Sequence, residues 1–184
     1  MIHIIGLGGV GFWLTIGLSR MVPSSDIHCW DDDTLEGTGA MRLPLAPSRT
    51  TKTDLLHGFL SMTFGDLVLP TMHLTKFTAM TGVSSNDLII DCTDMPLLRR
   101  KRMWTYSRKA GAKLLRVSYD GRGSTVLVST GLPLSAPPEG GYAAMPSLAL
   151  SFAAGGIGAE AVKRYMDNPV DSFTVALSIE ESMK

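Results

Sequence analysis

A glycine-rich segment near the start of the chain has the spacing of a phosphate-binding loop. Gly6, Gly8, Gly9 and Gly11 follow a short apolar run and precede a stretch of helix-compatible residues. Glycines allow a tight turn and let the backbone approach a phosphate, while the free N–H groups at the start of a helix favour an anion. A glycine turn needed only for packing is the alternative interpretation, but the expected strand, loop and helix favour a ligand's phosphates.

A single aspartate strengthens this interpretation. Asp31 lies at the end of the second expected strand, about twenty residues beyond the glycines, where a carboxylate can accept hydrogen bonds from ribose hydroxyls. Sites for NAD and for ATP both use this device, so the pattern predicts a nucleotide and leaves its identity open. An NAD(P)-dependent oxidoreductase is therefore one alternative, although no Tyr-x-x-x-Lys pair or placed His/Asp dyad indicates a hydride-transfer site.

The elements that must position these residues alternate along the chain. Apolar runs predict strands at residues 2–7, 26–30, 87–91, 113–119, 125–129 and 172–179, and helices are expected at residues 10–21, 52–62, 96–110 and 146–166. Residues 65–82 are ambiguous, with room for a strand and a short helix, and residues 37–51 and 132–142 are expected to be loops. Such an alternation predicts an α/β, Rossmann-like fold with a mostly parallel sheet and helices on both faces.

Length and composition exclude several classes of protein. The 184 residues suit one domain, so residues 1–184 are expected to form a single nucleotide-binding domain. Seventeen basic residues balance seventeen acidic ones, which gives no overall field for nucleic acid or an anionic membrane. Cys29 and Cys92 are too few for paired CxxC zinc motifs or a disulfide framework. With no signal-peptide pattern and no long apolar stretch, a cytoplasmic location is expected.

Further motifs resemble the ThiF/MoeB family, the bacterial relatives of ubiquitin-activating enzymes. The segment from Asp31 to Leu35, followed by Arg42, looks like the D-x-D-x-V... N-x-x-R signature of that family, and Lys52 falls near its downstream ATP-contacting lysine. Asp91-Cys92-Thr93-Asp94 resembles its D-x-x-D strand end, and Arg99 stands in the place of the arginine that follows. Residues 146–162 are similar to its late glycine- and alanine-containing helix, so the resemblance covers nearly the whole chain.

The resemblance implies ATP-dependent adenylation of the C-terminal carboxylate of a small ubiquitin-like or sulfur-carrier protein, with Mg²⁺ as cofactor and pyrophosphate as product. It implies a partner ending in Gly-Gly and a homodimer. The glycines would hold phosphates and Asp31 the ribose, and Asp33 and Arg99 would also line the nucleotide site. Arg42 and Lys52 would neutralise phosphate charge as it redistributes, and Asp94 would supply magnesium with a hard oxygen ligand.

Each charged residue also has a structural interpretation. Asp33 and Lys52 suit solvated loop positions, and Arg99 begins a basic run typical of an exposed helix face. Asp94 is also suited to cap the helix that follows it. The four histidines, at positions 3, 28, 57 and 73, show no metal-ligand spacing.

Two residues depart from the family pattern. Gly39 stands where the family has a phosphate-contacting asparagine, and Met95 follows Asp94 where asparagine is usual. Cys29 and Cys92 are expected to lie in buried strands, so neither is an obvious acceptor for a thioester or persulfide. These departures leave open a degenerate, non-catalytic member that binds nucleotide or a partner protein without turnover.

Overall fold

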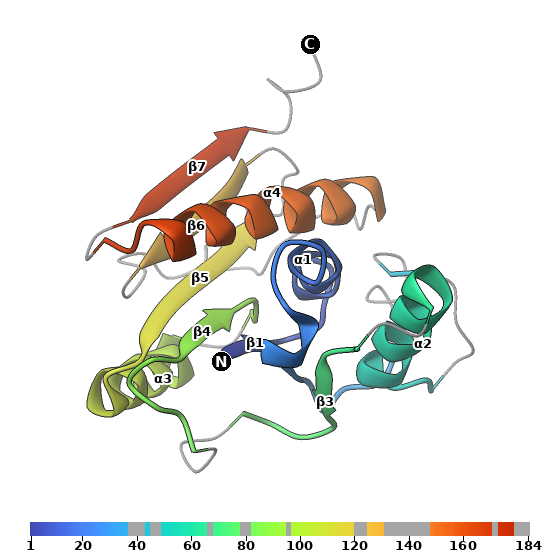
Figure 1. Ribbon diagram of the computed structural model, residues 1–184, viewed down its shortest axis with the longest axis horizontal. Coiled ribbons are helices and arrows are strands. Elements are labelled where there is room, and N and C mark those ends of the chain that lie inside the picture. Colours follow the sequence, from blue (N-terminus) through green and yellow to red (C-terminus); the bar gives the residue numbers. More distant parts are fainter. Residues whose placement is uncertain are drawn as a thin grey trace.

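The computed structural model describes residues 1–36, 43–44, 49–65, 68–77, 82–94, 97–119, 125–130, 148–170 and 173–178. Strands and helices alternate through most of the chain (Figure 1). The strands are β1 (Ile2–Ile5), β2 (Ile27–Trp30), β3 (Thr71–His73), β4 (Leu88–Asp91), β5 (Lys113–Tyr119), β6 (Thr125–Thr130) and β7 (Thr174–Ser178). The helices are α1 (Gly11–Leu18), α2 (Lys52–Phe64), α3 (Leu97–Ala110) and α4 (Leu148–Asp167), with a short 3-10 helix η1 (Ser24–Asp26) before β2.

The described strands form one seven-stranded sheet in the order β3-β2-β1-β4-β5-β6-β7. Neighbours from β3 to β5 are parallel, whereas β6 and β7 pair antiparallel. The strand order reverses beside β1, which pairs with β2 on one side and β4 on the other. In open α/β sheets ligands bind at such a switch point, outside the carboxyl ends of the strands. The topology therefore directs attention to the ends of β1, β2 and β4.

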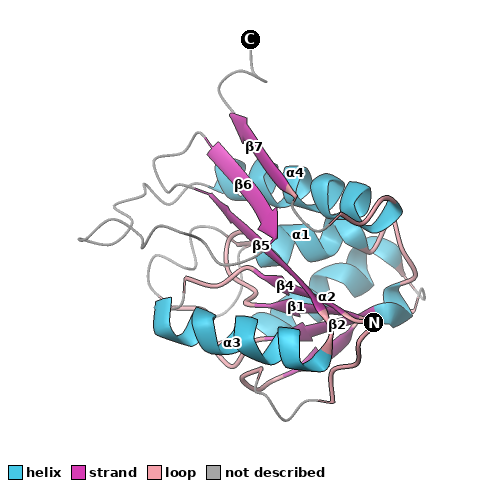
Figure 2. Cartoon of the chain, turned by 90° about the vertical axis from the view of Figure 1, so that its left-hand side faces the viewer, coloured by secondary structure: helices cyan, strands magenta, loops and turns pink. Residues whose placement is uncertain are grey.

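The two faces of the sheet are covered differently. Helices α1, α2 and α4 lie on one face and α3 lies on the other (Figure 2). The larger apolar cluster joins α1, α2 and α4 to the sheet. A smaller cluster around Ile5, Trp30, Ile89 and Met103 lies beneath α3. This arrangement confirms the predicted α/β fold with a mostly parallel sheet and helices on both faces.

Close packing explains glycines inside α4, where glycine ordinarily weakens a helix. A Cβ at Gly155 would lie 2.3 Å from Trp13 Cβ and 2.7 Å from Leu14 N, so any side chain would push α4 away from α1. A Cβ at Gly158 would lie 2.8 Å from Val117 Cγ1 on β5. These glycines let α4 pack directly against α1 and the sheet.

The elements differ from the sequence predictions mainly at their ends. Helix α1 ends at Leu18, and β1 ends at Ile5, where the chain enters the glycine turn. The ambiguous stretch contains β3, which pairs with β2. Part of the first expected loop, the whole of the second (residues 132–142) and residues 146–147 of the last expected helix lie outside the described residues. Within the described ranges no helix has both the length and the apolar character needed to cross a membrane.

Candidate functional site

The glycine loop joins the end of β1 to the start of α1. At two of its glycines, Gly6 and Gly11, neighbouring atoms leave no room for a side chain. Gly6 has φ of 87°, and a Cβ there would lie 2.8 Å from Thr93 Cγ2. A Cβ at Gly11 would lie 1.9 Å from the Gly6 carbonyl oxygen. By contrast, a Cβ at Gly8 would have no neighbour within 4 Å among the described atoms. The loop is thus tight on its inner side and open at Gly8, which suits the approach of a phosphate.

Helix α1 begins as an anion site would require. Val10 occupies its N-cap position, where no side chain caps the helix in the described structure, and Gly6 N donates to the carbonyl of Trp30 at 2.9 Å. Uncapped N–H groups at a helix start favour a phosphate. The loop is therefore tied to β2 at one end and leads into an uncapped helix at the other.

Asp31 is built into this loop. It is 8% exposed, and its Oδ2 accepts a hydrogen bond from Leu7 N at 2.6 Å while its Oδ1 accepts one from Asp33 N at 2.8 Å. Burial raises the pKa of the Asp31 carboxyl, and the neighbouring Lys52 ammonium and these N–H donors oppose that rise. Each carboxylate oxygen can accept more than one hydrogen bond, so ribose hydroxyls can still be bound.

Lys52 completes a constellation that sequence spacing only suggests. It is the first residue of α2, and its Nζ lies 2.7 Å from Asp33 Oδ2 and 3.6 Å from Asp31 Oδ2. Thr51 holds the start of this helix by accepting a hydrogen bond from Asp54 N at 3.0 Å. The Lys52 side chain is 15% exposed, so it is positioned by its neighbours. The structure thus brings Lys52, Asp31 and Asp33 together beside the glycine loop.

Carboxylate oxygens of Asp31, Asp32 and Asp33 lie within 4.8 Å of one another. Lys52 pairs with Asp31 and Asp33, and Lys76 lies 3.3 Å from Asp32. Because lysines balance these carboxylates, the geometry describes a charge network around the loop.

The end of β4 presents the second part of the candidate site. Asp91 is 4% exposed, and its Oδ1 accepts hydrogen bonds from Thr93 N at 2.9 Å and Thr93 Oγ1 at 2.6 Å. Thr93 is also the residue that faces Gly6 across the loop. Asp94 follows it as an exposed carboxylate. As a hard oxygen donor at the open edge of the site, Asp94 fits the requirement for a magnesium ligand.

The basic run of α3 divides between the surface and the interior. Arg99 is exposed, as its structural interpretation suggests, whereas Arg100 is 4% exposed and buried. Arg116 on β5 is also buried, with Nη1 4.0 Å from Asp91 Oδ2. Neither buried arginine was predicted from the sequence. The signal for Arg116 was a charge inside the apolar run Leu114-Leu115-Arg116-Val117, which strand alternation directs to the α3 face.

Several predicted residues lie outside the part of the chain that the structure describes. Arg42 and Gly39 lie outside the described residues, as do Met95 and Pro96 before α3. The phosphate role of Arg42, the effect of Gly39 and Met95, and the capping role of Asp94 therefore stay predictions.

Three histidines that look unrelated in the sequence meet on the α3 face of the sheet. His28 Nδ1 and His73 Nε2 lie 3.0 Å apart in rings inclined by 17°, with centroids 5.2 Å apart. That nearly coplanar, edge-on geometry is that of an N–H···N hydrogen bond. His3 accepts a hydrogen bond from Trp30 Nε1 at 3.3 Å and lies 3.4 Å from Asp87 Oδ2. Burial is the main cause of the lowered pKa of His3 and of His73.

The cysteines provide no activated nucleophile. Cys29 is fully buried, and burial raises its pKa to about 12. Burial also raises the pKa of Cys92, which follows β4. Cys29 is buried within β2, as predicted, whereas Cys92 is half-buried and lies just after β4, outside the strand in which it was expected.

Comparisons with known proteins identify the fold. No protein-family model and no curated protein sequence matches the chain. Among solved structures, E. coli MccB matches with a TM-score of 0.72 and 13% identity over 97% of this chain and 59% of that one. E. coli MccB with ATP gives a TM-score of 0.70 and 14% identity over 97% and 61%, and PaaA gives 0.67 and 14% over 98% and 61%. The chain spans about three fifths of these proteins and shares their fold.

Proposed function

We propose that this chain is an adenylating enzyme, which uses ATP to activate the C-terminal carboxylate of a peptide or small protein. The observation that carries the proposal is the position of Lys52, 3.6 Å from the Asp31 carboxylate that binds Leu7 N in the glycine loop. A phosphate cradle, a ribose acceptor and a cation thus share one constellation. A triphosphate needs such a cation, because its charge redistributes during the reaction.

The fold supports the same class of reaction. One MccB structure was determined with ATP, and another presents the microcin C7 biosynthetic enzyme MccB in complex with N-formylated MccA. A fold that holds both a nucleotide and a peptide suits peptide activation. The motifs that resemble the ThiF/MoeB family favour a small ubiquitin-like or sulfur-carrier protein ending in Gly-Gly as the acceptor.

The proposed reaction follows from the charges. A carboxylate oxygen of the acceptor attacks the α-phosphorus, the bond from that phosphorus to the bridging oxygen breaks, and pyrophosphate leaves with the electron pair. Two anions must meet, so Lys52 and Arg42 are proposed to neutralise the phosphates while the loop N–H groups hold them in place. Bound magnesium would neutralise further phosphate charge, and Asp94 is the residue that would hold it. We further propose that the chain forms a homodimer and acts in the cytoplasm.

Exchange of radiolabelled pyrophosphate into ATP tests this reaction. The assay uses the wild-type chain with a carrier protein ending in Gly-Gly and with an N-formylated peptide, and exchange above a no-acceptor control is expected with one of them. Failure with both acceptors, despite ATP binding, would favour the degenerate, non-catalytic alternative.

Two variants assign the roles within that assay. Asp94→Asn keeps the shape and capping ability of the side chain and removes its charge, so exchange should fall by about a hundredfold or more while the melting temperature stays unchanged. Normal exchange in a folded Asp94→Asn protein would remove Asp94 from the site. The double variant Cys29→Ser, Cys92→Ser should retain exchange if it folds, because adenylation needs no thiol nucleophile.

A further inference from the structure

Arg116 is a buried charge that the proposed nucleotide site does not use. The residue is 5% exposed and lies in the middle of β5, between apolar neighbours that pack on the opposite face of the sheet. Burying a guanidinium is costly unless acceptors surround it. An arginine at this position therefore calls for an anion.

The nearest described carboxylate satisfies this need only in part. Asp91 Oδ2 lies 4.0 Å from Arg116 Nη1, which is an ion pair beyond hydrogen-bond distance. The other oxygen of Asp91 is engaged by two hydrogen bonds from Thr93. Among the residues that the structure describes, Arg116 Nη1 has no hydrogen-bond acceptor. Nη1 of Arg116 is thus held beside Asp91 with donor capacity left over.

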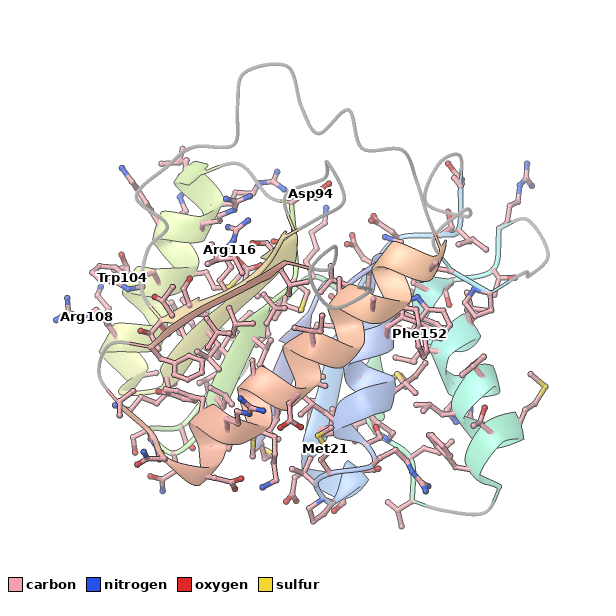
Figure 3. The ribbon with its side chains drawn as sticks, turned by 90° about the horizontal axis from the view of Figure 1, so that it is seen from above. Met21, Asp94, Trp104, Arg108, Arg116 and Phe152 are labelled. Carbon is pink, nitrogen blue, oxygen red and sulfur yellow. The ribbon has the colours of Figure 1, made fainter. Side chains whose placement is uncertain are left out.

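The position of Arg116 relates it to the glycine loop. Asp91 is in register with Ile5 on one side and with Arg116 on the other, so β4 separates Arg116 from the strand that leads into the loop. Two strand spacings amount to roughly 10 Å, which an arginine side chain and a small anion can bridge in large part. Arg116 and Asp94 are labelled in Figure 3 at the end of the sheet from which α3 starts. An anion at Arg116 would therefore lie beside the phosphates, on the side opposite Asp31 and Lys52.

The position of that anion, on the side of the loop opposite Asp31 and Lys52, indicates its chemistry. Nucleotide phosphates already have the glycine loop and Lys52 on the β1 and β2 side. The second anion of an adenylation reaction is the acceptor carboxylate, whose two oxygens match the planar guanidinium fork. We propose that Arg116 binds the C-terminal carboxylate of the acceptor and orients it toward the α-phosphate. This inference rests on the proposed function and adds a residue that determines specificity for a free C-terminus.

The test compares an acid with its amide. The probes are N-acetyl-Gly-Gly and its C-terminal amide, titrated by ligand-detected NMR into the whole chain with magnesium and AMPCPP, whose methylene bridge blocks pyrophosphate release. The wild type should bind the acid at least tenfold more tightly than the amide. Arg116→Gln should abolish this preference and leave the AMPCPP affinity within twofold. Arg108→Gln, an exposed arginine at the other end of α3, is the charge-matched control and should keep the preference.

The outcomes are separable. A folded Arg116→Gln protein that still prefers the acid tenfold would overturn the proposal, as would a wild type that binds acid and amide equally. Loss of AMPCPP affinity with the acid preference intact would assign Arg116 to the phosphates instead. If Arg116→Gln does not fold, Arg116→Lys keeps the charge without the fork, and a reduced preference is expected from it. A wild type that binds no AMPCPP contradicts the proposed function, whereas the acid-to-amide ratio measured without nucleotide still decides the role of Arg116.

Discussion

The two faces of the sheet are built on different physical principles. On the face covered by α1, α2 and α4, buried side chains are almost all apolar, and Gly155 and Gly158 bring helix α4 into direct contact with its neighbours. The face beneath α3 holds a set of buried ionisable groups, which are His3, Asp87, Asp91, Arg100 and Arg116. The first face stabilises the fold through packing. The second depends on paired charges, which extend to the edge of the sheet where the candidate site lies.

The largest difference should appear when a charge on the α3 face is deleted. Asp91→Ala removes the partner of Arg116 and both hydrogen bonds to Thr93, which leaves a buried guanidinium uncompensated. We expect the free energy of unfolding in urea to fall by about 3–5 kcal/mol. Asp32→Ala, which removes an exposed pair with Lys76, is the control and should cost less than about 1 kcal/mol. Equal stabilities of the two variants would contradict the importance of charge pairing on this face.

On the packed face, stability should depend on side-chain volume instead of charge. Gly155→Ala places a methyl group 2.3 Å from Trp13 Cβ, and overpacking of this kind typically costs about 1–3 kcal/mol. Gly156→Ala is a matched control in the same helix, because its Cβ meets nothing within 4 Å in the described structure. That variant should be stabilised by up to about 1 kcal/mol through helix propensity. Thermal melts of the pair decide the point, and a Gly155→Ala protein as stable as Gly156→Ala would refute the close contact.

The smallest expected effect is a pH dependence confined to the α3 face. Burial lowers the pKa of His73 below its ordinary 6.5, so the unfolded chain binds a proton first as the pH falls. Stability should therefore decrease from about pH 7 toward pH 5, by about 1.4 kcal/mol for each unit of pKa difference. The buried His3 contributes with the same sign. Chemical denaturation at several pH values in this range gives the change of unfolding free energy with pH. This pH dependence should be weaker in His73→Gln and unchanged in His57→Gln, an exposed histidine on α2. A His73→Gln protein whose unfolding free energy changes with pH as in the wild type would exclude His73 as a source of the pH dependence.

Sequence patterns predicted the packed face better than the charged one. Apolar runs and the glycine loop gave the α/β fold, because periodicity and turn chemistry are local properties. They also led to Asp31, whose carboxylate accepts a hydrogen bond from Leu7 N in the glycine loop. Its role as a ribose acceptor stays a prediction. The meeting of His28 with His73 was not foreseeable, since it depends on the parallel pairing of β2 with β3. Arg100 was hidden in a basic run that was expected to face solvent, and only the docking of α3 distinguishes it from Arg99.

Calorimetry tests the central claim that the glycine loop, Asp31 and Lys52 form an ATP site. Titrations of the wild-type chain with ATP plus magnesium and with NAD should show tighter binding of ATP. Lys52→Met should weaken ATP binding by about tenfold or more, because it removes a charge-assisted phosphate contact. Lys76→Met removes a lysine paired with Asp32 and should leave ATP affinity nearly unchanged. Tight binding of NAD with no detectable binding of ATP would contradict the account and favour an oxidoreductase.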